Sequence, residues 1–149
     1  MFKKETVKKF IAFHEFLEKI SWLPILIGRL SIGWVFLSTG WGKLHNLDYV
    51  IQYFESLGIP YASLQAPFVA TVEFLGGLSL ILGLGSRYFA AMLTGVMTVA
   101  ILTAHAEDIS QFSDVFKLFE FAYIIILGMI ATKGAGPLSL DTAFKKQLQ

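Results

Sequence analysis

The sequence predicts an all-α membrane protein: a bundle of four transmembrane helices, preceded by an amphipathic helix at the membrane surface. Of the 149 residues, 55% are hydrophobic and 15% are charged, and the mean hydropathy is +0.64. A soluble domain has roughly 45–50% apolar and about 25% charged residues. Four apolar stretches, separated by polar segments, account for the excess. A chain of this length forms one domain and leaves no room for a separate soluble catalytic module.

Composition also excludes several functions. The formal charge of +1 and a pI near 8.0 do not favour binding to nucleic acid. The chain contains no cysteine. It therefore forms no disulfide, carries out no thiol exchange, anchors no c-type haem and ligates no iron–sulfur cluster.

Residues 1–21 form the predicted amphipathic segment, in which apolar residues recur near helical spacing among lysines and glutamates. These apolar residues are Phe2, Val7, Phe10, Ile11, Phe13, Leu17 and Ile20. The first predicted span follows at 22–44. Pro24 suits its first helical turn, and Trp22 suits the aromatic belt at the membrane interface.

The polar stretch 45–66 contains a short predicted amphipathic helix that ends at Gly58. The remaining predicted spans are 67–84, 88–105 and 116–131. Because only residues 85–87 separate the second span from the third, these two form a tight antiparallel hairpin. The four spans make up a transmembrane domain over 22–132, and residues 133–149 are the predicted cytoplasmic tail.

The basic residues predict the orientation, because Lys and Arg in short loops favour the cytoplasm. Nine of the 12 lie in the N-terminal segment, in the turn between the second and third spans, and in the tail, whereas only Lys43 and Lys117 lie on the opposite side. The opposite side is rich in acidic residues, so we expect both termini to be cytoplasmic.

Three charged residues interrupt the apolar segments: Arg29, Glu73 and Glu120. A single ionised side chain at the centre of a membrane costs roughly 2.5–3.5 kcal/mol on insertion scales, so each needs a partner. With about 1.5 Å of rise per residue, Arg29 lies about 10 Å and Glu73 about 16 Å from the cytoplasmic ends of their spans. We expect these two to pair. Glu120 lies about 20 Å from the cytoplasmic end of its span. We expect it to lie nearer to His105 than to Arg29.

Several motifs, in this order and spacing, resemble the DoxX family of small bacterial membrane proteins over about residues 24–144. They are Arg29-Leu30-Ser31-Ile32-Gly33, Gly40-Trp41-Gly42-Lys43-Leu44, Glu73-Phe74-Leu75-Gly76-Gly77, Leu82-Gly83-Leu84-Gly85-Ser86-Arg87, Glu120 and Gly136-Pro137-Leu138-Ser139-Leu140-Asp141. The resemblance implies a place in the bacterial inner membrane. Some members are similar to the small subunit of a thiosulfate:quinone oxidoreductase, and others are linked to membrane oxidoreductase complexes. A quinone-linked role follows by analogy with the family.

A quinone site needs an apolar slot and polar groups for the headgroup. The candidate polar residues are Arg29, Lys43, Glu73, His105 and Glu120, and the candidate slot residues are Trp34, Phe36 and Trp41. Two other interpretations stay open. In one, Arg29 and Glu73 fix helix packing by pairing with each other, and no ligand is bound. In the other, the embedded polar groups form a column from mid-membrane to the outer face that conducts protons or ions.

We expect no metal or haem site. His45 and His105 both emerge at the outer end, but they lack ordered ligand spacing with Glu107 and Asp108.

Two classes of function therefore remain. In the first, the chain is the membrane subunit of a quinone-linked oxidoreductase or respiratory-type complex, and a partner protein or soluble donor supplies the electrons. In the second, it is a non-catalytic accessory or assembly subunit of a larger membrane complex. Both imply the lipid bilayer and other membrane subunits as partners, and the first adds a quinone.

Overall fold

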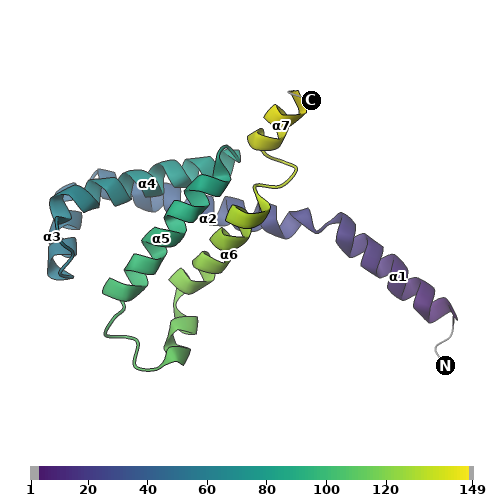
Figure 1. The fold of residues 1–149 in the computed structure, drawn as a ribbon, viewed down its shortest axis with the longest axis horizontal. Helices are drawn as coiled ribbons and strands as arrows, with labels where there is room; N and C mark the ends of the chain where they lie inside the picture. The colour runs from purple at the N-terminus through teal and green to yellow at the C-terminus, as the bar shows by residue number, and fades with distance from the viewer. Residues whose placement is uncertain (1–3, 148–149) are drawn as a thin grey trace.

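A computed structural model describes residues 4–147. The ends of the predicted N-terminal segment and tail, residues 1–3 and 148–149, lie outside the described residues. Within 4–147 the chain is helical and contains no strand (Figure 1). The elements are α1 (Lys4–Lys19), α2 (Trp22–Leu44), α3 (Leu47–Ser56), α4 (Ala62–Leu82), α5 (Ser86–Thr103), the 3-10 helix η1 (Phe112–Lys117), α6 (Phe119–Lys133) and α7 (Leu140–Gln147).

The sequence located the long helices well. The first predicted span, 22–44, coincides with α2, and the short helix predicted to end at Gly58 is α3. Helices α4 and α5 each begin before the predicted spans 67–84 and 88–105 and end before them too. The early starts arise because backbone hydrogen bonds continue into residues outside the apolar pattern. Helix α4 ends early because Gly83 has a positive φ, which stops the helix.

The segment predicted as a fourth span, 116–131, is divided in the structure. Leu118 has an extended backbone, with φ −81° and ψ 137°, and separates η1 from α6. Helix α6 has 15 residues, which at about 1.5 Å per residue is shorter than the roughly 30 Å hydrocarbon core. Within 4–147, three segments are long and apolar enough to cross a membrane: Val7–Leu44, which contains α2, and α4 and α5.

Glycines set the contact between α2 and α4. A Cβ atom at Gly40 would collide with the backbone of Phe74, and one at Gly77 would collide with the backbone of Leu37. Small residues allow this approach, in which van der Waals packing replaces the hydrophobic effect between membrane helices.

Helices α4 and α5 are joined by a tight turn, as predicted. Gly83 and Gly85 both have positive φ, 70° and 62°, a conformation that glycine adopts without steric cost. Helix α5 then packs beside α6, and α6 also contacts α2 (Figure 1). Where the four helices meet, the buried core contains Ile32, Phe36, Val72, Leu80, Ala90, Leu93, Leu127 and Ile130.

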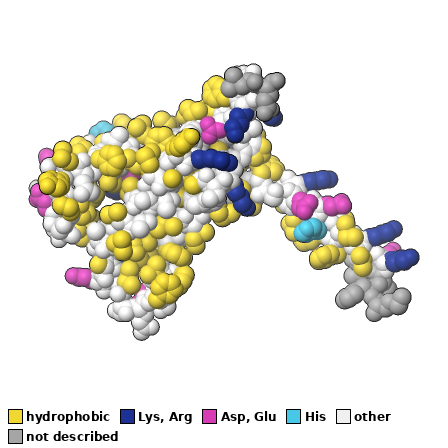
Figure 2. Space-filling model, in the orientation of Figure 1, with side chains coloured by type: hydrophobic (Ala, Val, Ile, Leu, Met, Phe, Trp, Pro, Cys, Tyr) yellow, Lys and Arg dark blue, Asp and Glu magenta, His cyan; other side chains and the backbone are white. Residues whose placement is uncertain are grey.

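The outside of the bundle is apolar. Figure 2 shows hydrophobic side chains over most of its visible face. Trp34, Phe68 and Leu102 are exposed large apolar residues on α2, α4 and α5. Contiguous apolar surface of this kind belongs in lipid rather than in water. The chain is a membrane protein.

Candidate functional site

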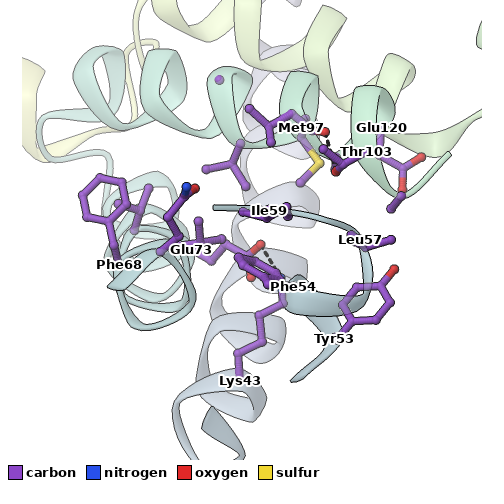
Figure 3. A pocket seen from close by; sticks show the side chains of 18 of the residues that line it. Lys43, Tyr53, Phe54, Leu57, Ile59, Phe68, Glu73, Met97, Thr103 and Glu120 are labelled. Carbon is purple, nitrogen blue, oxygen red and sulfur yellow. Dashed lines mark hydrogen bonds and ion pairs between the residues drawn. The ribbon is translucent and has the colours of Figure 1, made fainter. Parts of the chain in front are cut away.

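A cavity of about 530 Å³ opens between α3, α4 and α5, at the end of the bundle where α2 ends and α6 begins. Its walls are mainly apolar (Figure 3). They comprise Tyr53, Phe54, Leu57 and Ile59 from α3 and the turn after it, Phe68, Val69 and Val72 from α4, and Met92, Val96, Met97, Val99 and Ala100 from α5. Four ionisable side chains also line it: Lys43, Glu73, His105 and Glu120.

Lys43 and Glu73 form an ion pair on one side of this cavity. The Nζ atom of Lys43 lies 2.6 Å from Oε1 of Glu73 (Figure 3). Glu73 is only 1% exposed, and its second carboxylate oxygen, Oε2, is buried without a hydrogen-bond partner among the described residues. A buried acceptor without a partner costs about 1–3 kcal/mol. This oxygen therefore carries an uncompensated desolvation cost in the structure.

His105 and Glu120 form the second polar pair. Nε2 of His105 lies 3.3 Å from Oε1 of Glu120, and Nδ1 lies 2.9 Å from Oδ2 of Asp108. The expectation that Glu120 lies near His105 is confirmed. The Oε2 atom of Glu120 resembles that of Glu73: it is buried and has no hydrogen-bond partner in the described part of the chain.

The carboxylates around His105 stabilise its protonated form. The hydrogen bond with Asp108 raises the pKa of the imidazole above its ordinary value of 6.5, and Glu120 raises it further, while burial opposes both. Each cavity carboxylate thus faces a nitrogen that carries or accepts a proton. Such an arrangement donates and accepts hydrogen bonds and exchanges protons in apolar surroundings.

Arg29 and Glu73 do not form the predicted pair. The guanidinium of Arg29 donates hydrogen bonds to the carbonyls of Ala135 (2.6 Å) and Leu138 (2.8 Å), in the connection between α6 and α7. The helix register explains the error. Gly83, directly after α4, lies beside the side chain of Arg29, whereas Gly40 lies beside the backbone of Glu73.

Eleven residues therefore separate the levels of Arg29 and Glu73 along α2, which is about 16 Å. Arg29 and Glu73 lie at different levels because α2 extends beyond the end of α4. The ends of the two helices are not level.

The two predicted slot tryptophans lie elsewhere. Trp34 is 67% exposed on the outer face of α2, and Trp41 is 55% exposed and packs on His45 with ring centroids 4.1 Å apart. Phe36 belongs to the buried core. Of the predicted site residues, Arg29, Trp34, Phe36 and Trp41 are not among the described residues that line the cavity.

Sequence reasoning missed the wall contributed by α3. The apolar repeat that predicted this helix also includes Phe54 and Leu57, and an amphipathic helix must cover something apolar. That signal identified a buried face but not the cavity beneath it. Sequence reasoning also missed Asp108, three residues after His105, as a hydrogen-bond partner of the imidazole. Within residues 4–147 no three His, Cys, Asp or Glu side chains are grouped to hold a metal ion.

A second group of contacts brings together three motifs that are distant in sequence. The N–H of Asp141 donates to the carbonyl of Gly83 (3.0 Å), and the N–H of Gly85 donates to Oδ1 of Asp141 (2.9 Å). Together with Arg29, they fasten the connection after α6 to the turn between α4 and α5.

The family model for DoxX matches residues 24–106, which include the Arg29, Lys43, Glu73 and Gly83 motifs. The chain belongs to the DoxX family. No solved structure matches it.

Curated relatives of this DoxX protein span most of its length. It is 27% identical over 135 residues to Inner membrane protein YqjF of Escherichia coli (strain K12), covering 88% of this chain and 99% of that protein. It is 29% identical over 118 residues to a Bacillus subtilis (strain 168) protein named "Putative oxidoreductase CatD", covering 78% of this chain and 83% of that protein. Inner membrane protein YphA of Escherichia coli (strain K12) is 26% identical over 122 residues, with 78% and 87% covered.

Proposed function

We propose that this DoxX protein is the membrane subunit of a quinone-linked oxidoreductase and that its 530 Å³ cavity holds the quinone headgroup. One observation carries the proposal. Two carboxylates in one largely apolar cavity, Glu73 and Glu120, each have a buried oxygen with no partner among the described residues. A volume of this size lies in the range of small-molecule sites, which combine apolar walls with a few polar groups.

The donor set fits a quinone. Its two ring carbonyls accept hydrogen bonds, and its reduction to quinol takes up two electrons and two protons. Lys43 supplies an ammonium group on one side. On the other side His105, whose ring nitrogens contact Asp108 and Glu120, supplies a proton through Glu120. Glu73 and Glu120 hold these two groups in place and accept or release protons. Because the chain has no cysteine, we assign the supply of electrons to a redox-active partner subunit.

The proposed site is reached from the membrane. Apolar residues of α3, α4 and α5 form its walls, and the outer faces of these helices carry exposed apolar side chains. A lipid-soluble substrate therefore needs no aqueous route. The name of the relative CatD supports an oxidoreductase role, and the names YqjF and YphA support a place in the bacterial inner membrane.

The proposal includes a topology. Helices α2, α4, α5 and α6 cross the membrane, with η1 completing the short α6, and α1 lies on the cytoplasmic surface. In Figure 2 the basic side chains visible on the bundle lie at the end near α7. The turn at Gly83 and the segment at Asp141 are hydrogen-bonded at this end, so both belong on one side of the membrane. The positive-inside rule favours the cytoplasm for that side and for both termini.

A second candidate, the accessory or assembly subunit, is favoured by α1. This helix extends away from the bundle (Figure 1), and Phe10, Phe13 and Phe16 on it are exposed. An uncovered apolar face suits either a membrane surface or a partner protein.

The discriminating experiment is mild detergent extraction of the full chain from native membranes, followed by mass spectrometry of co-purified proteins and quinones. We expect near-stoichiometric quinone, reduced several-fold by Glu73→Gln and by Glu120→Gln. Glu107→Gln is the matched control, because this exposed carboxylate does not line the cavity. A stable complex that retains no quinone on this subunit favours the accessory role and rejects the quinone site.

A further inference from the structure

A second cavity lies at the opposite end of α5 and α6. Its volume is about 520 Å³, and it is enclosed by the first turn of α5, the end of α6 and helix α7. Arg87, Lys133 and Lys145 line it, together with one acidic residue, Asp141. None of these residues belongs to the quinone site proposed above, so the inference drawn from them is independent of that proposal.

The charges of this cavity are unbalanced. Asp141 already accepts the Gly85 N–H at 2.9 Å. Neither Lys133 nor Lys145 lies within 4.0 Å of a carboxylate in residues 4–147. Three cations against one anion leave a local excess of positive charge, which favours an anionic ligand.

Backbone geometry fixes the position of the arginine. The guanidinium Nη2 of Arg87 donates to the carbonyl of Lys133 at 3.2 Å. Gly134, with φ 90°, leaves the space beside it, because a Cβ atom there would lie 3.0 Å from Nε of Arg87. The same wall contains the N-terminus of the 18-residue helix α5, whose dipole adds partial positive charge.

The rim of the cavity is apolar. Tyr88 (79% exposed) and Phe144 (53% exposed) line it, and Leu138 lies exposed on the connection that borders it. A free inorganic anion gains nothing from these side chains. A phospholipid places its phosphate among the cations and its glycerol and acyl chains against the apolar rim. Basic pockets at the ends of membrane helices are suited to anionic headgroups.

We propose that this cavity binds the phosphate of an anionic phospholipid through Arg87, Lys133 and Lys145. The bound lipid bridges α5, α6 and α7 at the end of the bundle where Arg29 and Asp141 already fasten the chain. Anionic phospholipid is therefore expected to stabilise the protein beyond the general effect of a bilayer.

The test uses the full chain purified in mild detergent. Thermal unfolding and native mass spectrometry are recorded after addition of phosphatidylglycerol, phosphatidylcholine or inorganic phosphate. The variant is Lys133→Gln with Lys145→Gln, which preserves the hydrogen bond of Arg87. The matched control is Lys9→Gln with Lys146→Gln, which removes the same charge from exposed residues outside the cavity.

We expect phosphatidylglycerol to raise the melting temperature of the wild type and the control more than phosphatidylcholine does. The lysine variant should lose affinity for phosphatidylglycerol by about fivefold for each charge removed, following roughly 1 kcal/mol per basic residue. Equal retention of phosphatidylglycerol by the variant and the control would overturn the proposal. An equal rise in melting temperature with inorganic phosphate would show a free-anion site and overturn it as well.

Discussion

The Nζ atom of Lys43 lies 2.6 Å from Oε1 of Glu73, although 30 residues separate them in the chain. The contact joins the last turn of α2 to the middle of α4. The side chain of Glu73 is 2% exposed and that of Lys43 is 33% exposed. This ion pair therefore neutralises the buried carboxylate of Glu73. It also forms one side of the cavity between α3, α4 and α5.

Glu73→Gln should destabilise the protein by roughly 1–3 kcal/mol, because it leaves Lys43 half-buried without its carboxylate. Lys43→Met should be similarly destabilising, since it leaves the buried carboxylate unpaired. The double variant should be less destabilised than the sum of the two single variants. Thermal unfolding in detergent measures the stability of all three variants. If the two single effects simply add up in the double variant, the ion pair between Lys43 and Glu73 is contradicted.

Gly40→Ala and Gly77→Ala should each destabilise the bundle by about 1–3 kcal/mol, because the new methyl group meets backbone atoms that cannot move aside. Gly42→Ala and Gly128→Ala are matched controls on α2 and α6, where a Cβ atom meets nothing within 4 Å. The comparison of melting temperatures checks this. Equal effects in the two sets would mean that α2 and α4 do not approach as closely as described.

Arg29→Met should release the segment after α6. It removes both hydrogen bonds to the carbonyls of Ala135 and Leu138. Amide hydrogen exchange should then accelerate in residues 134–147 while the middle of α4 stays protected. Arg29→Lys keeps the charge but loses the planar guanidinium that donates to two carbonyls at once. It should give an intermediate rate of amide exchange. Unchanged exchange in Arg29→Met would show that Asp141 holds the segment alone.

The stabilising contribution of His105 should depend on pH. Its pKa is raised in the folded protein, chiefly by the hydrogen bond with Asp108. The contribution is therefore fully present below about pH 6.5, the ordinary value, and is lost as the pH rises through the raised pKa. The melting temperature of the wild type relative to His105→Gln should fall over that interval.

Asp108→Asn should move the pH dependence of this difference to lower pH, because it removes the main cause of the raised pKa. His45→Gln is the control for a general histidine effect: within residues 4–147 its ring lies within 4.0 Å of no carboxylate. A pH-independent difference for His105→Gln would contradict the contacts with Asp108 and Glu120.

Much of the fold was predictable, since membrane helices are encoded locally. The apolar run of α2 gave its bounds. Arg29, Gly33 and Gly40, which recur at helical spacing, lie on its buried face. The proximity of His105 and Glu120 also followed from the hairpin-like order of α5 and α6. These inferences need only the rise and period of a helix and the position of the connecting loops.

The partners of Arg29 and Glu73 were not predictable in the same way. Both side chains reach across helices, so their contacts depend on how far α2 is displaced along α4, and the glycine contacts at Gly40 and Gly77 set that displacement. The wall that α3 contributes to the cavity likewise depends on where a loop returns to the bundle.

By itself, the sequence determined that this chain is a helical membrane protein of the DoxX type, and it determined which residues are too polar for lipid. Composition and period encode those properties directly. Only the tertiary structure decided that Glu73 pairs with Lys43 and that Arg29 fastens the segment after α6. It also decided that a mainly apolar cavity with two carboxylates lies at one end of α5 and α6, and a basic cavity at the other. The physical reason is that side-chain partners across helices are fixed by interhelical register, which depends on the close packing of a few glycines.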